Sequence, residues 1–313
     1  MITPDEARQF AQKHFPNAPE KLIEELGIEL NESELSGCDG WCLSLGDTAI
    51  IRLNSKLGVG RRRFTLAHEL SHLILGIPGV IGETYEQMLS SSLEEERQFN
   101  ELASELLLPT TIVRQLIPDV PVVFGALKRL AKKANVSELA AAIRVCNLSQ
   151  ELGLINSSVV FFSSGTAVSW QWSTTLEMPE DTAISLLESA RGSSPDVFRF
   201  KRTDGQVIVA SIIENPNFGS ATLFVQLLPE ELGLQTSQHE HRKKLENELF
   251  AGNVKLQQRM SGFFGAHKGR IASMTLKQAI EDFWNRYESQ LKSTPVNSSL
   301  GREYVELRIK EWF

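Results

Sequence analysis

Residues 64–76, with the sequence FTLAHELSHLILG, are the most constraining stretch of this chain. Hydrophobic residues recur there at helical spacing, Gly76 and Pro78 end the pattern, and Glu69 is the one charged residue in it. A single carboxylate in a buried helix is costly unless another group compensates its charge. The stretch therefore predicts a buried helix that carries a carboxylate for a chemical reason.

Two histidines flank this carboxylate in the run His68-Glu69-Leu70-Ser71-His72. Histidines one helical turn apart share a face, with Cβ atoms roughly 5–6 Å apart, so both rings can bind one metal ion at about 2.0–2.1 Å. Glu69 lies beside that face, where it can hold a water molecule and take its proton. The run indicates zinc-dependent hydrolysis with Glu69 as the catalytic base. The alternative is a chance match in which both histidines are ordinary core residues.

A catalytic zinc ion usually has three protein ligands and one open position. Glu96, on the next expected helix, is the predicted third ligand, and Asn100 lies one turn later on the same face. Asn100 can then orient a metal-binding histidine through the second ring nitrogen of that histidine. Glu94 and Glu95 are rival ligands, although acidic residues at a helix start also complement the helix dipole.

The stretches RRRFTLAHELSHLILG and EERQFNELASELLLP resemble the ImmA/IrrE group of zinc metallopeptidases, and the likeness is specific over residues 50–110. The resemblance implies a gluzincin-like site in which His68, His72 and Glu96 bind zinc and Glu69 is the catalytic base. It also implies a substrate, because members of the group cleave a helix-turn-helix transcriptional repressor and so switch on stress, mobile-element or defence genes.

Two departures from the group accompany this resemblance. Ser71 stands where members commonly have glycine, and residues 77–92 are loop-like. No residue is assigned to oxyanion stabilisation, for which the candidates by residue type are Tyr85, His239, His241 and His267. Two other functions remain open: a non-catalytic regulator that binds protein or DNA, and a zinc hydrolase of small amides.

The amino-acid composition limits the class of protein that this chain can be. The chain has 313 residues, of which 42% are hydrophobic and 23% charged, so fibrous and wholly disordered classes are excluded. The net charge of −7 gives the whole surface no attraction for nucleic acid. The sequence has neither a long uncharged run nor a signal-like start, so we expect a cytoplasmic protein without a membrane partner. Three cysteines are too few for a disulfide framework.

The pattern of elements predicts an α+β fold in three parts. Residues 1–125 form the zincin-like metallopeptidase domain, residues 126–153 a helical segment that resembles a helix-turn-helix, and residues 154–313 a mixed regulatory domain, by analogy a GAF-like sensor. Expected helices and strands are residues 4–15, 20–26, 41–45, 48–53, 64–76, 92–108, 159–162, 168–172, 182–190, 207–213 and 221–228, with two helices in 126–150 and helices from 236 onward, broken near 262–269 and at 293–295.

Two cysteines precede the histidine-bearing helix. Cys38 and Cys42 lie in a region expected to border the cleft, and thiolates favour zinc. One of them could therefore occupy the open zinc position as an inhibitory thiolate. The alternative is that both are ordinary half-buried cysteines.

Residues 128–144 are locally basic and suggest a DNA contact. Basic residues outnumber the single acid in residues 126–150, although the hydrophobic face also suits a helical pair that only packs. In the C-terminal part, Trp170 and Trp172 could line a cavity for a small ligand or a nucleic-acid signal, or could be core residues.

Overall fold

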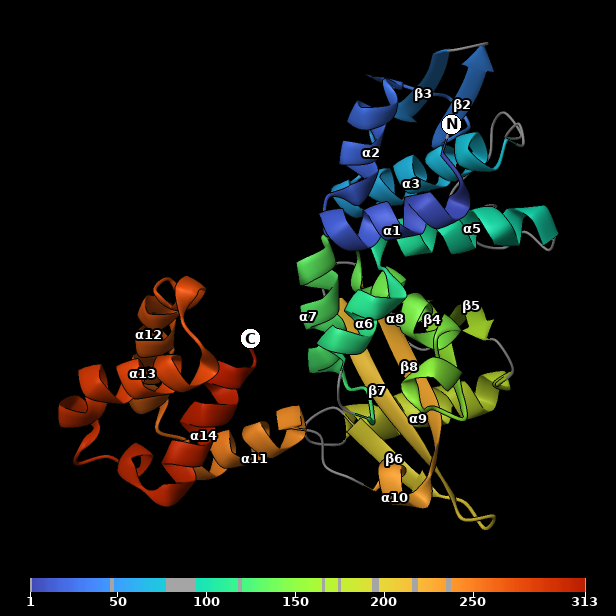
Figure 1. Cartoon of the computed structure of the whole chain (residues 1–313). Coiled ribbons are helices and arrows are strands. Elements are labelled where there is room, and N and C mark those ends of the chain that lie inside the picture. Colours follow the sequence, from blue (N-terminus) through green and yellow to red (C-terminus); the bar gives the residue numbers. More distant parts are fainter. Residues whose placement is uncertain are drawn as a thin grey trace. The chain divides into compact units, whose positions relative to one another are not determined.

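The computed structural model describes residues 2–45, 48–76, 94–117, 120–164, 167–173, 176–192, 197–215, 219–234 and 238–312 (Figure 1). Helices and strands are mixed, as expected. The chain divides into two compact units, Met1–Leu234 and Gln235–Phe313. The boundaries predicted at residues 125 and 153 both lie inside the first unit, so the three-part functional division remains a prediction.

The N-terminal part of the first unit holds two helices before its first strand. Thr3 caps the first of them and forms a capping box with Glu6, while Gly27, in the left-handed conformation, ends the second. The elements of this part are α1 (Pro4–His14), α2 (Ala18–Leu26), β1 (Glu29–Ser33), β2 (Gly40–Leu45), β3 (Thr48–Asn54), α3 (Val59–Leu75) and α5 (Glu94–Leu107).

Strands β1, β3 and β2 form a sheet in that order. The expected antiparallel pair β2–β3 is present, and β1 pairs with β3 in parallel. Sequence patterning misses β1 because its residues are mostly polar and exposed. A Cβ atom at Gly40 would lie 2.7 Å from Thr65 Cγ2, so glycine lets β2 approach α3 closely.

Helix α3 begins earlier than predicted, because Arg61, Arg62 and Arg63 belong to its first turns rather than preceding it. Arginine is a good helix former, so the basic residues extend the helix back toward Gly58. Every residue from 63 to 74 is buried. Helix α3 packs along α5 in a core that also takes in residues of α1, α2 and β3.

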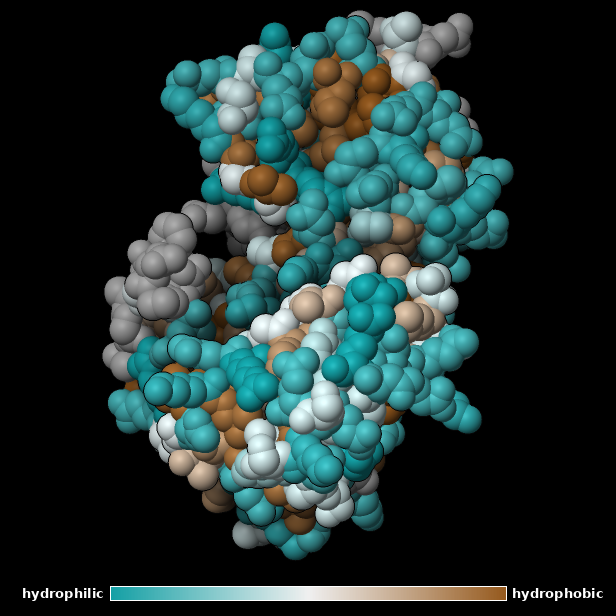
Figure 2. All heavy atoms as spheres, turned by 90° about the vertical axis from the view of Figure 1, so that its left-hand side faces the viewer, coloured by the Kyte–Doolittle hydropathy of each residue, from teal (hydrophilic) through white to brown (hydrophobic). Residues whose placement is uncertain are grey.

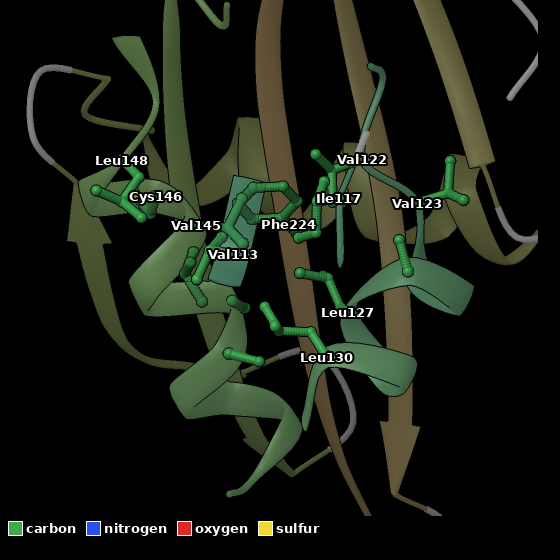
Figure 3. Close-up of a cluster of buried hydrophobic side chains, with 14 of the residues drawn as sticks. Val113, Ile117, Val122, Val123, Leu127, Leu130, Val145, Cys146, Leu148 and Phe224 are labelled. Atoms are coloured by element: carbon green, nitrogen blue, oxygen red, sulfur yellow. The ribbon is translucent and has the colours of Figure 1, made fainter. Parts of the chain in front are cut away.

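Four short helical elements follow α5: α6 (Thr110–Leu116), α7 (Phe124–Ala134), α8 (Glu138–Asn147) and η1 (Gln150–Leu152). The turn expected between the two main helices is present, with Asn135 in the left-handed conformation at the end of α7. Figure 3 shows the core beside these helices, in which Leu127 and Leu130 of α7 and Val145 of α8 gather with Phe224 of the adjacent sheet.

The remainder of the first unit is built on a five-stranded antiparallel sheet of order β5-β4-β8-β7-β6. Alternate strand residues face two separate cores, one beside α7 and α8 and one beneath α9 (Figure 1). Strand β6 is a short edge strand with charged residues, which explains why patterning misses it. The elements are β4 (Asn156–Ser164), β5 (Ala167–Ser173), α9 (Glu180–Arg191), β6 (Val197–Lys201), β7 (Gln206–Asn215), β8 (Ser220–Pro229) and α10 (Glu230–Gly233).

The second unit is helical and has its own core around Phe264, Phe283 and Tyr304. The break predicted near residues 262–269 is present at the end of that range, because one helix runs through Gly262 and ends after Lys268 with Gly269 as its C-cap. Its elements are α11 (Gln238–Phe250), α12 (Val254–Lys268), η2 (Ile271–Ser273), α13 (Leu276–Leu291), η3 (Pro295–Asn297) and α14 (Ser299–Lys310).

The surface seen in Figure 2 is largely hydrophilic, with hydrophobic side chains in patches. Among the helices that the structure describes, none combines the length and hydropathy needed to cross a bilayer.

Candidate metal centre

His68 and His72 lie one turn apart in the buried middle of α3, with exposed fractions of 1% and 3%. Their Nε2 atoms face each other at 3.1 Å. Two nitrogen atoms that bind the same tetrahedral zinc ion, each at about 2.0–2.1 Å, are roughly 3–3.5 Å apart. The two rings therefore already have the spacing of a shared metal ion.

Asn100 fixes the proton on the first of these rings. Its Oδ1 atom lies 3.1 Å from His68 Nδ1, which donates the hydrogen bond and leaves Nε2 with a lone pair. Burial, with a smaller contribution from His72, lowers the pKa of His68 to about 3. His68 is therefore neutral at pH 7 and can act as a metal ligand without losing a proton.

Aromatic rings hold the two imidazoles in place. Phe99 is fully buried, and its ring centroid lies 3.7 Å from that of His72 and 6.2 Å from that of His68. Phe64 also stacks on His68, with centroids 6.2 Å apart. Sequence reasoning missed Phe99, although its position directly before Asn100 is a usable signal.

Of the two predicted carboxylates, the structure describes the side chain of Glu69 but not that of Glu96. Glu69 is on α3, 4% exposed, beside the histidines in sequence. Glu96 lies in the first turn of α5, the helix that also carries Asn100, but its side chain is outside the described part of the chain, as are those of Glu94 and Glu95. Within the described residues no group of three potential ligands is present, so the third ligand remains a prediction.

The donors present suit a divalent metal ion such as zinc. The Nε2 atoms of two imidazoles converge, one ring is held by an amide oxygen, and a buried carboxylate lies on the same helix. Zinc is bound by nitrogen donors of this kind.

Cys38 precedes β2 and Cys42 lies within it, and both are partly buried. Burial raises the pKa of the Cys38 thiol, and the negative charges of Glu69 and Asp39 raise it further. Cys38 is therefore within electrostatic range of Glu69 and is a neutral thiol at pH 7. Whether either sulfur reaches the metal remains a prediction.

Arg63, which sequence reasoning did not single out, joins three parts of the first unit. Its guanidinium donates to Glu20 Oε1 at 2.6 Å, to the Pro16 carbonyl at 2.6 Å and to the Ala134 and Asn135 carbonyls at 2.6 and 3.0 Å. It lies five residues before the first histidine and is 6% exposed. This contact fixes α3 against α2 and the α7–α8 turn.

Of the four side chains considered for oxyanion stabilisation, the structure describes two, His241 and His267, and both belong to the second unit. His241 contacts Glu303 at 2.8 Å, and His267 contacts the Ala279 carbonyl at 2.8 Å, all within the second unit. Tyr85 and the side chain of His239 lie outside the described residues.

The basic segment at residues 128–144 is only partly exposed. Lys128, Lys132 and Lys133 are exposed on α7. Arg144 is 4% exposed, forms an ion pair with Glu105 and donates to the Leu108 carbonyl at 3.0 Å. The expectation that Arg144 contributes to a DNA surface is therefore wrong, because its charge is used inside the fold.

The two tryptophans of β5 pack against neighbouring side chains, and a ligand cavity beside them remains a prediction. Trp170 stacks on Phe161 with ring centroids 5.7 Å apart, and Trp172 donates from Nε1 to Asn147 Oδ1 at 2.8 Å. Both lie against the core beside α7 and α8.

The N-terminal part of the chain is similar in sequence to a known family of peptidase domains. Residues 23–145 match the family model Peptidase_M78, described as the IrrE N-terminal-like domain, which agrees with the resemblance seen in the sequence.

Two relatives carry the name "Radiation response metalloprotease IrrE". The protein of Deinococcus deserti is 35% identical over 95 residues, which are 29% of this chain and 34% of that protein. The protein of Deinococcus radiodurans is 32% identical over 95 residues, which are 29% of each chain. The match thus spans about a third of each relative. A solved structure titled "Mycobacterium tuberculosis transcriptional regulator" is similar with a TM-score of 0.45 and 14% identity, covering 71% of this chain and 74% of that one.

Proposed function

We propose that the chain is an intracellular zinc-dependent endopeptidase that cleaves a helix-turn-helix transcriptional repressor. The observation that carries the hydrolytic part is the approach of His68 Nε2 to His72 Nε2 at 3.1 Å, with Asn100 holding the first ring. The IrrE-like domain and the two relatives named as metalloproteases support it.

His68, His72 and Glu96 would hold the zinc ion. When bound, zinc polarises the carbonyl group of a scissile peptide bond and makes a nearby water molecule more acidic. Asn100 keeps the proton of His68 on Nδ1, so that Nε2 stays directed at the metal position.

Glu69 would supply the proton transfers. As a carboxylate beside the histidine pair it accepts a proton from the attacking water, and it donates that proton to the leaving amine when the peptide bond breaks. Its burial, at 4% exposed, keeps bulk water from competing for the carboxylate.

The test is a cleavage assay on candidate helix-turn-helix repressor proteins. We expect the full chain loaded with zinc to release two fragments, and chelation of the metal to stop release. Glu69→Gln should lower the rate by at least about 100-fold, because it removes the general base. The exposed Glu101→Gln on α5 is the matched control and should leave the rate unchanged.

Two outcomes would contradict this function. If Glu69→Gln cleaves as fast as the unchanged chain, the residue is not the base. If repressor function is lost without fragments, the chain is a non-catalytic regulator, the second function that the sequence left open.

A thiolate of Cys38 or Cys42 is proposed as an inhibitory ligand at the open zinc position. Replacing both with serine should then raise basal cleavage several-fold and remove any zinc–sulfur signal at about 2.3 Å from the X-ray absorption spectrum. Unchanged cleavage together with an unchanged spectrum would assign both cysteines to packing.

The remaining partners are proposals of the same kind. A DNA contact through residues 128–144 rests on the exposed lysines of α7, and a sensor role for residues 154–313 rests on analogy. Salt-sensitive DNA binding that is lost on reversing Lys132 and Lys133 would support the first of them.

A further inference from the structure

A pocket of about 830 Å³ opens within the first unit, and neither His68 nor His72 is among its lining residues. Its walls come from the first turns of α3, from α7, from the start of α8 and from strands β4, β7 and β8. Small-molecule sites usually have volumes of about 300–1,000 Å³. The pocket is therefore large enough for a metabolite-sized ligand.

Positive charge is concentrated on one wall. Lys128 and Lys132 lie one turn apart on the same face of α7, and both line the pocket. Among the described residues, neither ammonium has an ion-pair partner, whereas Arg61 in the same wall is paired with Asp39 at 2.5 Å. Like charges at this spacing repel each other, and an anion between them removes that repulsion.

One acidic side chain, Glu138, also lines the pocket at the start of α8. Helix N-termini carry partial positive charge, so the carboxylate there is balanced in part by the helix itself. The two lysines therefore leave the pocket with a positive balance.

The rest of the wall suits a flat, partly polar group. Phe64 of α3 and Phe161 of β4 present aromatic rings, and most other wall residues are hydrophobic. Of the hydroxyl-bearing wall residues, Ser163, Ser220 and Thr222 come from the neighbouring strands β4 and β8, and Ser137 is the N-cap of α8. Aromatic faces stack on flat rings, and hydroxyl groups bind the polar edges of such ligands.

We infer that this pocket binds a small aromatic phosphate of the nucleoside monophosphate type. The phosphate would lie between Lys128 and Lys132, and the ring would lie against the hydrophobic wall with Phe161. A free phosphate ion would leave the hydrophobic wall unused, and an uncharged nucleoside would leave the two lysines unpaired, so both parts of the ligand are needed.

The pocket adjoins the metal centre through one side chain. Phe64 lines the pocket, and its ring stacks on that of His68 with centroids 6.2 Å apart. A ligand packed against Phe64 would therefore restrain a ring that holds the metal-binding histidine. This consequence for catalysis rests on the proposed function, whereas ligand binding itself does not.

The test is isothermal titration calorimetry of the full chain with AMP, GMP, CMP and UMP, each in turn, without zinc and with zinc. Inorganic phosphate and adenosine are the partial probes. We expect at least one monophosphate to bind with a stoichiometry of one, and to bind more than tenfold more tightly than either partial probe. If none of the four binds at millimolar concentration, the inference is wrong.

Variants locate the binding. Lys132→Ala should weaken binding by about tenfold, the loss expected for one hydrogen bond to a charged group. Lys133→Ala, on the same helix but outside the pocket, is the matched control and should change nothing. Ala140→Phe should block the pocket without changing its charge. Equal losses from Lys132→Ala and Lys133→Ala would overturn the assignment.

Binding of a twelve-nucleotide single-stranded DNA distinguishes two roles for the lysines of α7, a monophosphate site and a nucleic-acid surface. If it binds tightly while the monophosphates do not, the charge on α7 belongs to a nucleic-acid surface and the pocket has no ligand. Because binding is measured without proteolysis, an inactive chain that still binds a monophosphate would refute the proposed function and leave this inference standing.

Discussion

At the scale of single residues, the site depends on which ring nitrogen of His68 carries the proton. The amide oxygen of Asn100 accepts from Nδ1 at 3.1 Å, and Nε2 is thereby left to face His72. Groups that orient a metal-binding histidine in this way commonly contribute 10–100-fold, as an order of magnitude, to metal affinity.

Asn100→Ala should therefore weaken zinc binding by about 10–100-fold, because His68 loses the group that fixes its tautomer. Asn100→Asp keeps an oxygen acceptor and should restore most of the affinity. The measurement is a competition titration with a chromophoric zinc chelator. Gln98→Ala, an exposed change on the same helix, is the control. Equal affinity in Asn100→Ala and the control would assign Asn100 to packing alone.

At the scale of elements, Arg63 connects α3 to two neighbouring parts of the unit. The buried guanidinium of Arg63 donates hydrogen bonds to one carboxylate and to several backbone carbonyls. Removing it leaves all of these acceptors without that donor.

Arg63→Met should therefore lower the free energy of unfolding by about 3–5 kcal/mol, as measured by urea unfolding. Arg62→Ala is the neighbouring control, because its ion pair with Glu32 is partly exposed, with side chains 34% and 42% accessible. That change should cost less than about 1 kcal/mol. Similar losses from the two variants would show that Arg63 does not act as a connection.

The ion pair of Glu105 with Arg144 connects α5 to α8 and makes stability depend on pH. Burial raises the pKa of Glu105, but the charge of Arg144 and hydrogen bonds from Thr110 and Arg144 lower it by more, so the pKa lies below its ordinary value of 4.5. A carboxyl group with a lowered pKa stabilises the folded chain above its unfolded pKa, and this stabilisation is lost as the pH falls through the folded pKa.

Glu105→Gln should therefore lower the free energy of unfolding at pH 7 by on the order of 2 kcal/mol, the size of a hydrogen bond to a charged group. The difference from the unchanged chain should shrink as the pH falls below 4.5, because Glu105 then loses its own charge. Urea unfolding at a series of pH values checks this. A difference that is constant with pH would contradict it.

At the scale of the whole molecule, local sequence patterns predicted many of the helices and strands. They predicted few of the contacts between residues that are far apart in the sequence. The helix of His68 and His72 and the hairpin of β2 and β3 follow from spacing within a few residues. Strands β1 and β6 were not predicted, because short, polar edge strands lack the alternating pattern of hydrophobic and polar residues.

The candidate site shows the same limit. The histidine pair and Asn100 were predictable because helical spacing sets which residues share a face. The partners of Arg63 and the burial of Arg144 depend on residues far apart in sequence, which periodicity does not report. The end of the first unit at Leu234 likewise reflects packing between elements rather than a local signal.

The most direct test of the metal centre is the X-ray absorption spectrum of the full chain loaded with one equivalent of zinc. We expect nitrogen and oxygen neighbours at about 2.0–2.1 Å, with the multiple-scattering pattern of two imidazole rings, and one ring fewer in His72→Ala. A spectrum without imidazole scattering, or one that His72→Ala leaves unchanged, would contradict a zinc ion held between His68 and His72.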